Sequence, residues 1–561
     1  MVTPTAEQLE ALAKFRTGRP LKVTAFAGAG KTTTLKLLAG SRPDRGIYLA
    51  FNKAIQLEAA EKFPDNVACS TTHSLAWQSI APRFSSGQMT GTMNANQLAE
   101  LMELKDRVFA QRIRLTGVHQ AHLILRTIRR FCQSADPEVL NAHVPQYGRL
   151  LGLKPAITAE VNAWAVEAAK ALWQKMTNHR DKTPLGHDGY LKLWALGRPQ
   201  LGYNFILLDE AQDTNPVVLG VLADQPSQIV YVGDRHQQIY EWRGAVNAMQ
   251  EIKGCEEAYL TQSFRFGQLI ADAASKVLRS LGERHSIRGN PAVQSVISDT
   301  SLTGTVLCRT NATVILEVLD ALEANLKAHV VGGTAELERL LSDVFELKKG
   351  EPGICPEFFG FTSWDQVVAF SETEEGEDIR TFVQLVEQHG EKKLWRAIKS
   401  AHDSEADADL ILSTAHKAKG REWDTVRLTP DFLNSRLTEG HPDAESEVRL
   451  FYVAMTRAKQ HLAVDPAMLA TFASNAWKTR TVDDAATPGE RQPHSPPRPS
   501  SAPRRTLPPP TRIREHVSDV ARSSYPPAVQ VQSPKRSVET PAQPPPKEPS
   551  FWQRIGRLLG G

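Results

Sequence analysis

The segment AFAGAGKTTTL, residues 25–35, contains the residue types that hold phosphate groups. It follows the run LKVTAF, which is typical of a buried strand, and it precedes a run that is typical of a helix. At such a junction, backbone N–H groups and the helix N-terminus bind phosphate, a lysine reaches the β and γ phosphates, and a hydroxyl group ligates Mg²⁺. The sequence assigns these last two roles to Lys31 and Thr32.

The glycine-rich segment departs from the usual phosphate-loop motif at one position. Ala25 stands where that motif begins with glycine, so an ordinary glycine-rich turn is an alternative. The candidate loop residues are Ala27, Gly28, Ala29, Gly30, Lys31, Thr32 and Thr33.

Two adjacent carboxylates, Asp209 and Glu210, follow the apolar run FILL. The carboxyl ends of parallel strands meet at one edge of a sheet, so we expect this pair beside the phosphate loop. Asp209 suits Mg²⁺, directly or through water, and Glu210 suits activation of an attacking water as a general base. Two solvated acids at a strand end are the alternative, which the phosphate loop and the following Gln212 and Asp213 disfavour.

The segment VGDRHQQIYEWRGA, residues 232–245, combines two chemistries. Asp234 and Gln237 suit a phosphate, whereas Tyr240 and Trp242 offer aromatic faces that stack on any base with about 1 to 3 kcal/mol each. A core strand followed by a polar loop is the alternative, although the polar neighbours of Trp242 fit a buried strand poorly. The segment is therefore predicted to couple a nucleotide site to a base-binding site.

Composition favours a soluble protein of several domains. The 561 residues are 41% hydrophobic and 23% charged, enough for several packed cores. The five cysteines include no CxxC pair, so neither a zinc site, an iron–sulfur cluster nor a disulfide framework is expected, and a reducing cytoplasm fits best. No stretch approaches the roughly 18 apolar residues of a membrane span. We expect a cytoplasmic protein, associated with the nucleoid if the source is bacterial.

The net charge of +3 is unevenly distributed. Basic residues dominate after Arg491, so the rest of the chain is mildly acidic. Binding of nucleic acid must therefore depend on local grooves rather than on bulk charge.

Strand-like runs such as IYLAF, FILLD and QIVYVGD alternate with helical stretches, which indicates an α/β fold with parallel sheets. A second α/β pattern begins near Glu257. The two patterns assign residues 1–87 with 201–256 to a first domain, and residues 257–334 with 406–476 to a second. Helical stretches such as EVNAWAVEAAKALWQKM indicate a mainly helical insertion at 88–200, and a smaller insertion is expected at 335–405.

The C-terminal region changes in composition. Proline, serine and arginine dominate residues 477–549, which predicts a disordered basic tail. In residues 550–561, Phe551, Ile555 and Leu558 fall on one helical face. This short amphipathic helix is predicted to bind a protein partner or an anionic surface, with an idle terminus as the alternative.

Five segments, DEAQD, VGDRHQQIYEWRGA, LTQSFRF, LSTAHKAKGREWDTVRL and FYVAMTRAK, occur in this order. Together they resemble superfamily 1 DNA helicases of the UvrD/Rep type, most closely the F-box DNA helicase branch, although no F-box is recognisable. The resemblance covers roughly residues 5–465 and implies two RecA-like P-loop motor domains, called 1A and 2A, with insertions 1B and 2B.

The resemblance also implies an ATP site built from both motor domains. Gln8 would recognise adenine, Phe264 would stack on it, and Gln237 would sense the γ phosphate. Arg265 and Arg457 would reach that phosphate from domain 2A, where their permanently charged forks suit the charge of a transferring phosphoryl group. In addition, Glu422 would lie near the ribose.

Single-stranded DNA would bind along a groove implied by the same resemblance. Arg309 also matches a family position, for which no role is assigned. The implied groove residues are Phe51, Asn52, His73, Tyr240, Trp242 and His416.

These features predict a monomeric ATP-dependent helicase or translocase that moves 3′ to 5′ on single-stranded and tailed duplex DNA in repair, recombination or replication. Because the 335–405 insertion is small, a translocase that strips proteins such as recombinase filaments from DNA is one alternative. A nucleotide-dependent scaffold acting through the tail is another. The intact set of hydrolysis residues disfavours the scaffold.

Overall fold

The computed structural model describes most of the chain. Tyr240, Trp242, the predicted tail beyond residue 480 and the predicted helix at 550–561 lie outside the described residues. In the part of the chain that is described, no helix combines the length and apolar character needed to cross a bilayer. The described residues are 3–110, 113–239, 247–299, 304–373, 375–438 and 440–480.

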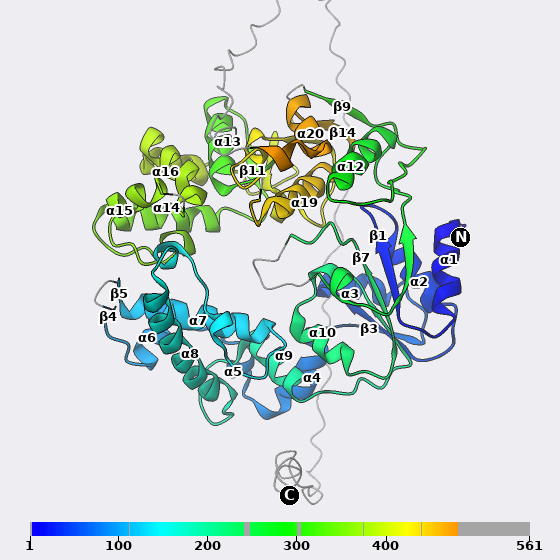
Figure 1. Ribbon diagram of the computed structural model, residues 1–561, viewed down its shortest axis with the longest axis horizontal. Helices are drawn as coiled ribbons and strands as arrows, with labels where there is room; N and C mark the ends of the chain where they lie inside the picture. Colours follow the sequence, from blue (N-terminus) through cyan, green and yellow to red (C-terminus); the bar gives the residue numbers. More distant parts are fainter. Residues whose placement is uncertain are drawn as a thin grey trace, which may run out of the picture. The chain divides into compact units, whose positions relative to one another are not determined.

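The first sheet has six strands in the order β3-β2-β6-β7-β1-β8, and every pairing is parallel (Figure 1). The strands are β1 (Leu21–Ala25), β2 (Gly46–Ala50), β3 (Val67–Thr71), β6 (Phe205–Leu208), β7 (Gln228–Gly233) and β8 (Glu256–Leu260). The helices of this domain are α1 (Ala6–Phe15), α2 (Lys31–Ala39), α3 (Lys53–Ala60), α4 (Thr72–Ile80), α10 (Pro216–Ala223) and α11 (Ala248–Glu251).

Strand β8 corrects one prediction. The sequence placed the start of the second α/β pattern near Glu257, but β8 pairs in parallel with β1 and completes the first sheet. A strand-like run does not reveal which sheet it joins, because that depends on the edge left open by the other strands. The second domain therefore begins after β8.

The second sheet also has six strands, in the order β11-β12-β10-β13-β14-β9, again with parallel pairings throughout. Helices α12, α19 and α20 gather around β9 and β14 (Figure 1). The strands are β9 (Val296–Ser298), β10 (Thr305–Cys308), β11 (Ala328–Val330), β12 (Leu410–Thr414), β13 (Trp423–Leu428) and β14 (Ala458–Ala463). The helices are α12 (Gln268–Ser280), α13 (Asn311–Glu323), α18 (Ala415–Ala418), α19 (Ala444–Met455) and α20 (Pro466–Ala473).

The second domain extends further than the sequence predicted. Residues Asn475–Thr479 form a 3-10 helix, η8, in which Trp477 is buried and donates from Nε1 to Ser280 Oγ at 3.1 Å. The tail was predicted from residue 477 on composition alone. Burial of this indole against α12 explains why the fold continues past residue 476.

Two insertions complete the described chain, and both are mainly helical. The first contains α5 (Ser86–Thr90), α6 (Ala95–Leu101), the antiparallel pair β4 (Arg107–Phe109) and β5 (Ile113–Leu115), α7 (Gly117–Gln133), α8 (Pro155–Thr177) and α9 (Gly186–Leu196). The second contains α14 (Ala335–Lys348), α15 (Trp364–Ser371), α16 (Glu377–His389) and α17 (Glu391–Lys399).

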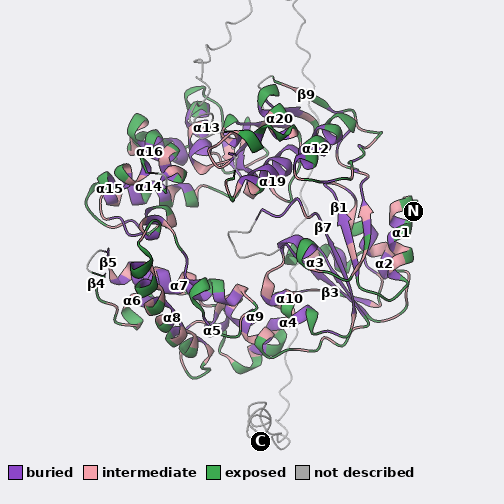
Figure 2. Cartoon of the chain, in the orientation of Figure 1, coloured by how far each residue is buried: buried purple, intermediate pink, exposed green. Residues whose placement is uncertain are grey.

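Each insertion shares a core with one face of a sheet. Along β6, Ile206 and Leu208 pack into the core of the first insertion, whereas Phe205 and Leu207 face the core beside α1 and α2. This alternation follows from the two-residue period of a strand. Figure 2 shows β1 and β7 buried, while exposed residues line the outer faces of α8 and α16.

The two insertions also contact each other. Phe359 of the second insertion is fully buried in the core of the first, where its ring lies 4.8 Å from that of Tyr147. Arg149 N donates to Phe359 O at 2.9 Å, and His119 Nε2 lies 3.0 Å from Gly353 O.

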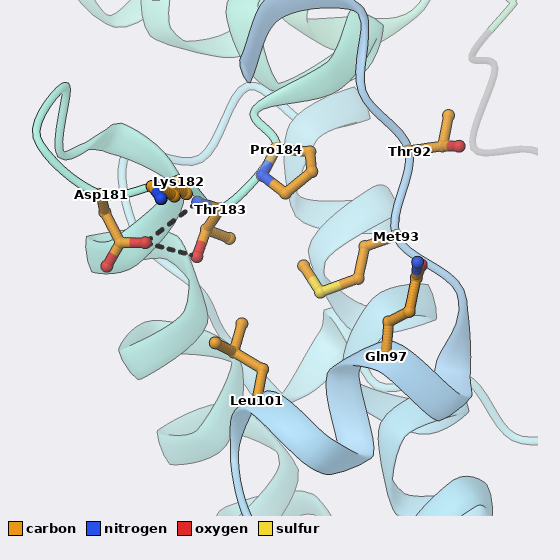
Figure 3. Close-up of a pocket in the computed structure, with 8 residues that line it drawn as sticks. All are labelled: Thr92, Met93, Gln97, Leu101, Asp181, Lys182, Thr183 and Pro184. Carbon is orange, nitrogen blue, oxygen red and sulfur yellow. Dashed lines mark hydrogen bonds between the residues drawn. The ribbon is translucent and has the colours of Figure 1, made fainter. Parts of the chain in front are cut away.

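A small pocket of about 250 Å³ lies within the first insertion (Figure 3). Asp181 accepts hydrogen bonds there from the backbone and hydroxyl of Thr183, which fixes the turn that forms one wall. Met93 and Leu101 line the opposite side. None of the candidate site residues lines this pocket.

Candidate active site

The phosphate loop connects β1 to α2 as the sequence predicted. Gly28 and Gly30 both have φ of 73°, a left-handed conformation that glycine adopts without the steric cost of a side chain. Lys31 begins α2, and Gly30 at the N-cap leaves the first turn without a side-chain cap. Backbone N–H groups at such a helix start are suited to an anion.

Lys31 forms an ion pair with Glu210, which lies just beyond the end of β6. Lys31 Nζ lies 2.7 Å from Glu210 Oε1 and donates to Oε2 at 2.8 Å. Burial would lower the pKa of Lys31, but Glu210 and Asp209 outweigh it and raise the pKa. Burial would raise the pKa of Glu210, but Lys31 lowers it below its ordinary value. Both groups are therefore charged at neutral pH.

Glu210 is held in an unfavourable backbone conformation. Its φ of 50° lies in the left-handed region, which costs a non-glycine residue roughly 1 to 2 kcal/mol. Gln212 Nε2 donates to Glu210 Oε2 at 2.6 Å and helps to fix the carboxylate. Strain of this kind persists where surrounding contacts impose it, which is common at functional sites.

Asp209 is buried beside this pair. Tyr48 OH donates to Asp209 Oδ2 at 2.7 Å, and Glu210 N donates to Oδ1 at 2.9 Å. Burial and the adjacent Glu210 raise the pKa of Asp209. Burial and Asp209 likewise raise the pKa of Tyr48, so this hydroxyl stays protonated and able to donate.

Gln237 is buried and oriented by Asp234. Gln237 Nε2 donates to Asp234 Oδ2 at 2.8 Å, and Tyr452 OH donates to the same oxygen at 2.9 Å. Tyr452 belongs to α19 of the second domain, and its hydroxyl accepts from Ala27 N at 3.1 Å. The amide of Ala27 in the phosphate loop is therefore bound to a side chain from the other domain.

Lys419 provides a second link between the domains. It follows α18 and donates to Asp213 Oδ2 and to the backbone oxygen of Gln237. Burial lowers the pKa of Lys419, although the nearby Asp213 opposes this shift. Burial also raises the pKa of Asp213 to about 6, although Lys419 opposes that shift.

Arg265 lies against the phosphate loop. A Cβ added to Gly28 would be 2.7 Å from Arg265 Cβ, and Phe264 N donates to Gly28 O at 2.8 Å. Arg265 Nε donates to Glu422 Oε2 at 2.6 Å. The first predicted arginine, its neighbour Phe264 and the predicted ribose-side acid thus meet at the loop.

The second predicted arginine, Arg457, is nearly fully buried after α19. It donates to the backbone oxygens of Val453 at 2.9 Å and Arg421 at 3.3 Å. Burial and the nearby charge of Arg265 lower the pKa of Arg457 to about 9. Like charges repel, so a bound anion near both guanidinium groups would relieve the effect of Arg265 on Arg457.

The residues predicted to hold the base also lie together. Gln8 is buried near the start of α1, and its Nε2 donates to Thr34 Oγ1 at 3.1 Å. A Cβ on Gly30 would lie 3.3 Å from the ring of Phe264 and 3.7 Å from Gln8 Nε2. Phe264 is 48% exposed, so one face of its ring is open to a ligand.

The described DNA-binding candidates follow the carboxyl ends of strands. Phe51 comes after β2 and is 55% exposed, and Asn52 caps α3 by accepting from Ile55 N at 2.9 Å. His73 lies in α4 after β3, where its ring is 5.9 Å from that of Tyr190 in the first insertion. His416 lies in α18 after β12 and is half-buried.

Arg309 forms a buried ion pair inside the second domain. Its guanidinium forms a bidentate pair with buried Glu447 of α19, with Nε donating at 2.9 Å and Nη2 at 2.5 Å. Asp431 accepts from the backbone of Arg309 and Thr310. These contacts join β10 to α19 inside the second domain.

Comparison with known proteins shows the family of this chain. The UvrD/REP helicase N-terminal domain matches residues 190–253, and the UvrD-like helicase C-terminal domain matches residues 364–467. F-box DNA helicase 1 of Gallus gallus is 32% identical over 498 residues, covering 81% of this chain and 48% of that protein. The chain belongs to the UvrD/Rep family of superfamily 1 DNA helicases.

A second relative of this UvrD/Rep helicase chain comes from yeast. F-box DNA helicase protein 1 of Schizosaccharomyces pombe is 31% identical over 522 residues, covering 85% of this chain and 59% of that protein. The chain thus spans about half the length of these curated relatives.

Three residues of this UvrD/Rep helicase site were not predicted from the sequence. Tyr48, Lys419 and Tyr452 contact Asp209, Asp213 and Asp234, respectively. Lys419 and Tyr452 lie inside LSTAHKAKGREWDTVRL and FYVAMTRAK, two of the segments that carry the family resemblance, and this position could have marked them as candidates. Nothing in the sequence marked Tyr48 as a candidate, since it lies in the strand-like run IYLAF like any other strand residue.

The oxygen donors of this UvrD/Rep helicase chain fit Mg²⁺. Thr32 supplies a hydroxyl and Asp209 a carboxylate, the ligand types that Mg²⁺ prefers. Among the described residues, no group of three or more His, Cys, Asp and Glu side chains is arranged to hold a metal. Few protein ligands are expected, because Mg²⁺ usually binds together with phosphates and water.

Proposed function

We propose that this chain hydrolyses ATP to move 3′ to 5′ along single-stranded DNA and to separate duplex strands. The main observation behind the proposal is that residues of both domains lie at the phosphate loop. Lys31 pairs with Glu210 on one side, and Arg265 lies against Gly28 on the other. Because both domains contact the same ligand site, hydrolysis there can be converted into movement of one domain relative to the other.

The ion pair between Lys31 and Glu210 suggests how hydrolysis begins. A bound triphosphate competes for Lys31, which releases Glu210 from its partner. The freed carboxylate then accepts a proton from the attacking water. Gln212, which donates to Glu210, keeps that carboxylate in place.

Charge on the transferring phosphoryl group is stabilised from the second domain. Arg265, which lies against Gly28, and Arg457, which feels the charge of Arg265, would supply the two guanidinium groups. Mg²⁺, when bound with the phosphates, would neutralise their charge, with Thr32 and Asp209 as its protein ligands. Phe264 and Gln8 bind the adenine, and Glu422 lies on the ribose side.

Movement on DNA follows from the segment after Gln237. This residue senses the γ phosphate, and Tyr240 and Trp242 come only a few positions later in the chain. The proposed single-strand groove is lined by these aromatics and by Phe51, Asn52, His73 and His416. Stacking on aromatic faces grips any base, which suits a motor without sequence preference.

The test is steady-state ATP hydrolysis with and without single-stranded DNA, followed by unwinding of duplexes with a 3′ or a 5′ tail. We expect DNA to stimulate hydrolysis and only the 3′-tailed duplex to be unwound. Glu210→Gln should lower the stimulated rate by about 10²- to 10⁴-fold. Glu257→Gln, which alters a surface carboxylate paired with Lys22, is the matched control and should behave as wild type.

Two outcomes would contradict the proposal. Equal hydrolysis rates with and without DNA would leave a nucleotide-dependent scaffold as the better function. Unwinding of the 5′-tailed duplex alone would reverse the direction.

The small second insertion favours a second candidate, displacement of proteins from single-stranded DNA. Four helices of 8 to 14 residues, α14 to α17, account for most of it. A protein-coated strand compared with a 3′-tailed duplex separates the two functions. Faster clearing of the coated strand than unwinding of the duplex would support displacement.

A further inference from the structure

Tyr452 occupies a position between the two domains that packing alone does not explain. Its side chain is completely buried in α19, yet its hydroxyl makes two hydrogen bonds to the first domain. It accepts from Ala27 N at 3.1 Å and donates to Asp234 Oδ2 at 2.9 Å. A core tyrosine needs one partner for its hydroxyl, whereas this one joins two functional segments.

Asp234 connects this hydroxyl to the catalytic candidates. The carboxylate oxygen that accepts from Tyr452 also accepts from Gln237 Nε2 at 2.8 Å. Asp234 N donates to Gln212 Oε1 at 3.1 Å, and Gln212 in turn donates to Glu210. Asp234 is completely buried, so its own bonds to Tyr452, Gln237 and Gln212 are shielded from water.

Arg457 follows the same helix, two residues beyond its end at Met455. Tyr452 O accepts from Thr456 Oγ1 at 2.8 Å, and Arg457 NH2 donates to Thr456 Oγ1 at 3.2 Å. The loop residues Phe26 and Ala27 pack in the core formed mainly by the second domain. The start of the phosphate loop is therefore packed against the second domain and hydrogen-bonded to α19, as well as being attached to its own sheet.

We propose that Tyr452 is a positioning residue that couples the phosphate loop and Gln237 to α19 and to Arg457 just beyond its end. Through its two hydrogen bonds, any shift of α19 changes the loop backbone and the orientation of Gln237 together. The arginine thus approaches the phosphate only when the sensor is aligned. This inference rests on the proposed ATP-driven motor and adds the part that synchronises its two domains.

The test is Tyr452→Phe, which removes only the hydroxyl and keeps the buried ring. Loss of a buried hydrogen bond to a charged group should lower the DNA-stimulated kcat by about 10- to 100-fold, while the KM for ATP changes little. Tyr259→Phe is the matched control, because Tyr259 OH donates to a surface carboxylate, that of Glu257. It should retain the wild-type kcat.

A readout independent of turnover is hydrogen exchange of the Ala27 amide in the nucleotide-free protein. In wild type this N–H is bound to Tyr452, so Tyr452→Phe should speed its exchange, whereas Tyr259→Phe should not. Unchanged exchange would show that the hydroxyl does not hold the loop and would overturn the proposal.

A double-mutant cycle with Gln237→Ala separates coupling from simple destabilisation. If Tyr452 acts through Gln237, adding Tyr452→Phe to Gln237→Ala should lower kcat by about twofold or less. Losses that multiply independently would overturn the proposal. Should Tyr452→Phe fail to fold, Asp234→Asn tests the same bond from the other side and should also lower kcat without raising KM.

Failure of this inference is distinguishable from failure of the proposed function. If wild type shows no DNA-stimulated hydrolysis, the motor itself is wrong. If wild type is stimulated and Tyr452→Phe matches it in both kcat and amide exchange, only the positioning role is wrong.

Discussion

Lys31 Nζ lies 2.7 Å from Glu210 Oε1, so the lysine of the phosphate loop and the proposed general base neutralise each other. The pair has two consequences for ligand binding. A phosphate must displace Glu210 to gain the lysine, and the displaced carboxylate then lies near the phosphate and repels it.

Glu210→Gln should therefore bind ATP at least as tightly as wild type, because it removes a competing anion beside Lys31. Lys31→Met should weaken binding, since it removes the loop's own cation. Titration with a fluorescent ATP analogue measures both affinities. Weaker binding by Glu210→Gln than by wild type would argue against this competition.

Gly28→Ala should impair the approach of Arg265. A Cβ at Gly28 would lie 2.6 Å from Ser263 Oγ and 2.7 Å from Arg265 Cβ, so these groups must move. A misplacement of about 1 Å at a catalytic group can cost about 100-fold in rate. We expect a loss of that order in kcat/KM, measured by ATP titration in the presence of DNA.

Gly18→Ala is the control for backbone strain. Gly18 has φ of 79°, close to that of Gly28, but an added Cβ would meet nothing within 4 Å. Both variants should lose about 1 to 2 kcal/mol of stability from left-handed strain. Only Gly28→Ala should lose kcat/KM; an equal loss in both variants would make the contact with Arg265 irrelevant.

Phe51→Ala should weaken binding of single-stranded DNA. An exposed aromatic that stacks on a base contributes about 1 to 3 kcal/mol, so the dissociation constant should rise about 5- to 150-fold. Leu57→Ala provides a matched control, because Leu57 in the neighbouring α3 is 54% exposed, close to the 55% of Phe51. Fluorescence anisotropy of a labelled oligonucleotide measures the effect. Equal weakening by both changes would speak against stacking.

Glu447→Ala should destabilise the second domain by about 3 to 5 kcal/mol, because it leaves the Arg309 guanidinium without its buried partner. Glu445→Ala removes a carboxylate from the same helix whose side chain is 60% exposed and paired with Arg449. That change should cost about 1 kcal/mol or less. Urea unfolding measures both values, and similar losses would show that burial of the pair does not matter.

The ion pair between Arg309 and Glu447 also predicts that stability depends on pH. Burial would raise the pKa of Glu447, but Arg309 lowers it below the ordinary value of 4.5. A carboxylate with a lowered pKa stabilises the fold fully above its ordinary pKa, and this contribution is lost as the pH falls through the folded-state value. Between pH 6 and pH 3, wild type should therefore lose more stability than Glu447→Ala in urea unfolding. Parallel curves would be inconsistent with this linkage.

Local patterns were sufficient for the phosphate loop, the carboxylate pair and the α/β alternation. The loop before Lys31 and the residue Glu210 each follow a recognisable strand, and parallel strands bring such ends to one edge. The prediction that both domains contribute to one site agrees with the position of Arg265 beside Gly28. The roles of all these residues in binding ATP or DNA stay predictions, and Tyr240 and Trp242 also lie outside the described residues.

The sequence by itself determined which short segments can bind phosphate and which runs form strands, because both depend on residues that are neighbours in the chain. Only the tertiary structure decided that β8 closes the first sheet, that Phe359 docks in the first insertion and that Glu447 is the partner of Arg309. It also decided that Tyr452 reaches Ala27, 425 positions away. Such contacts depend on how whole sheets and helices pack, and no local period of side chains encodes them.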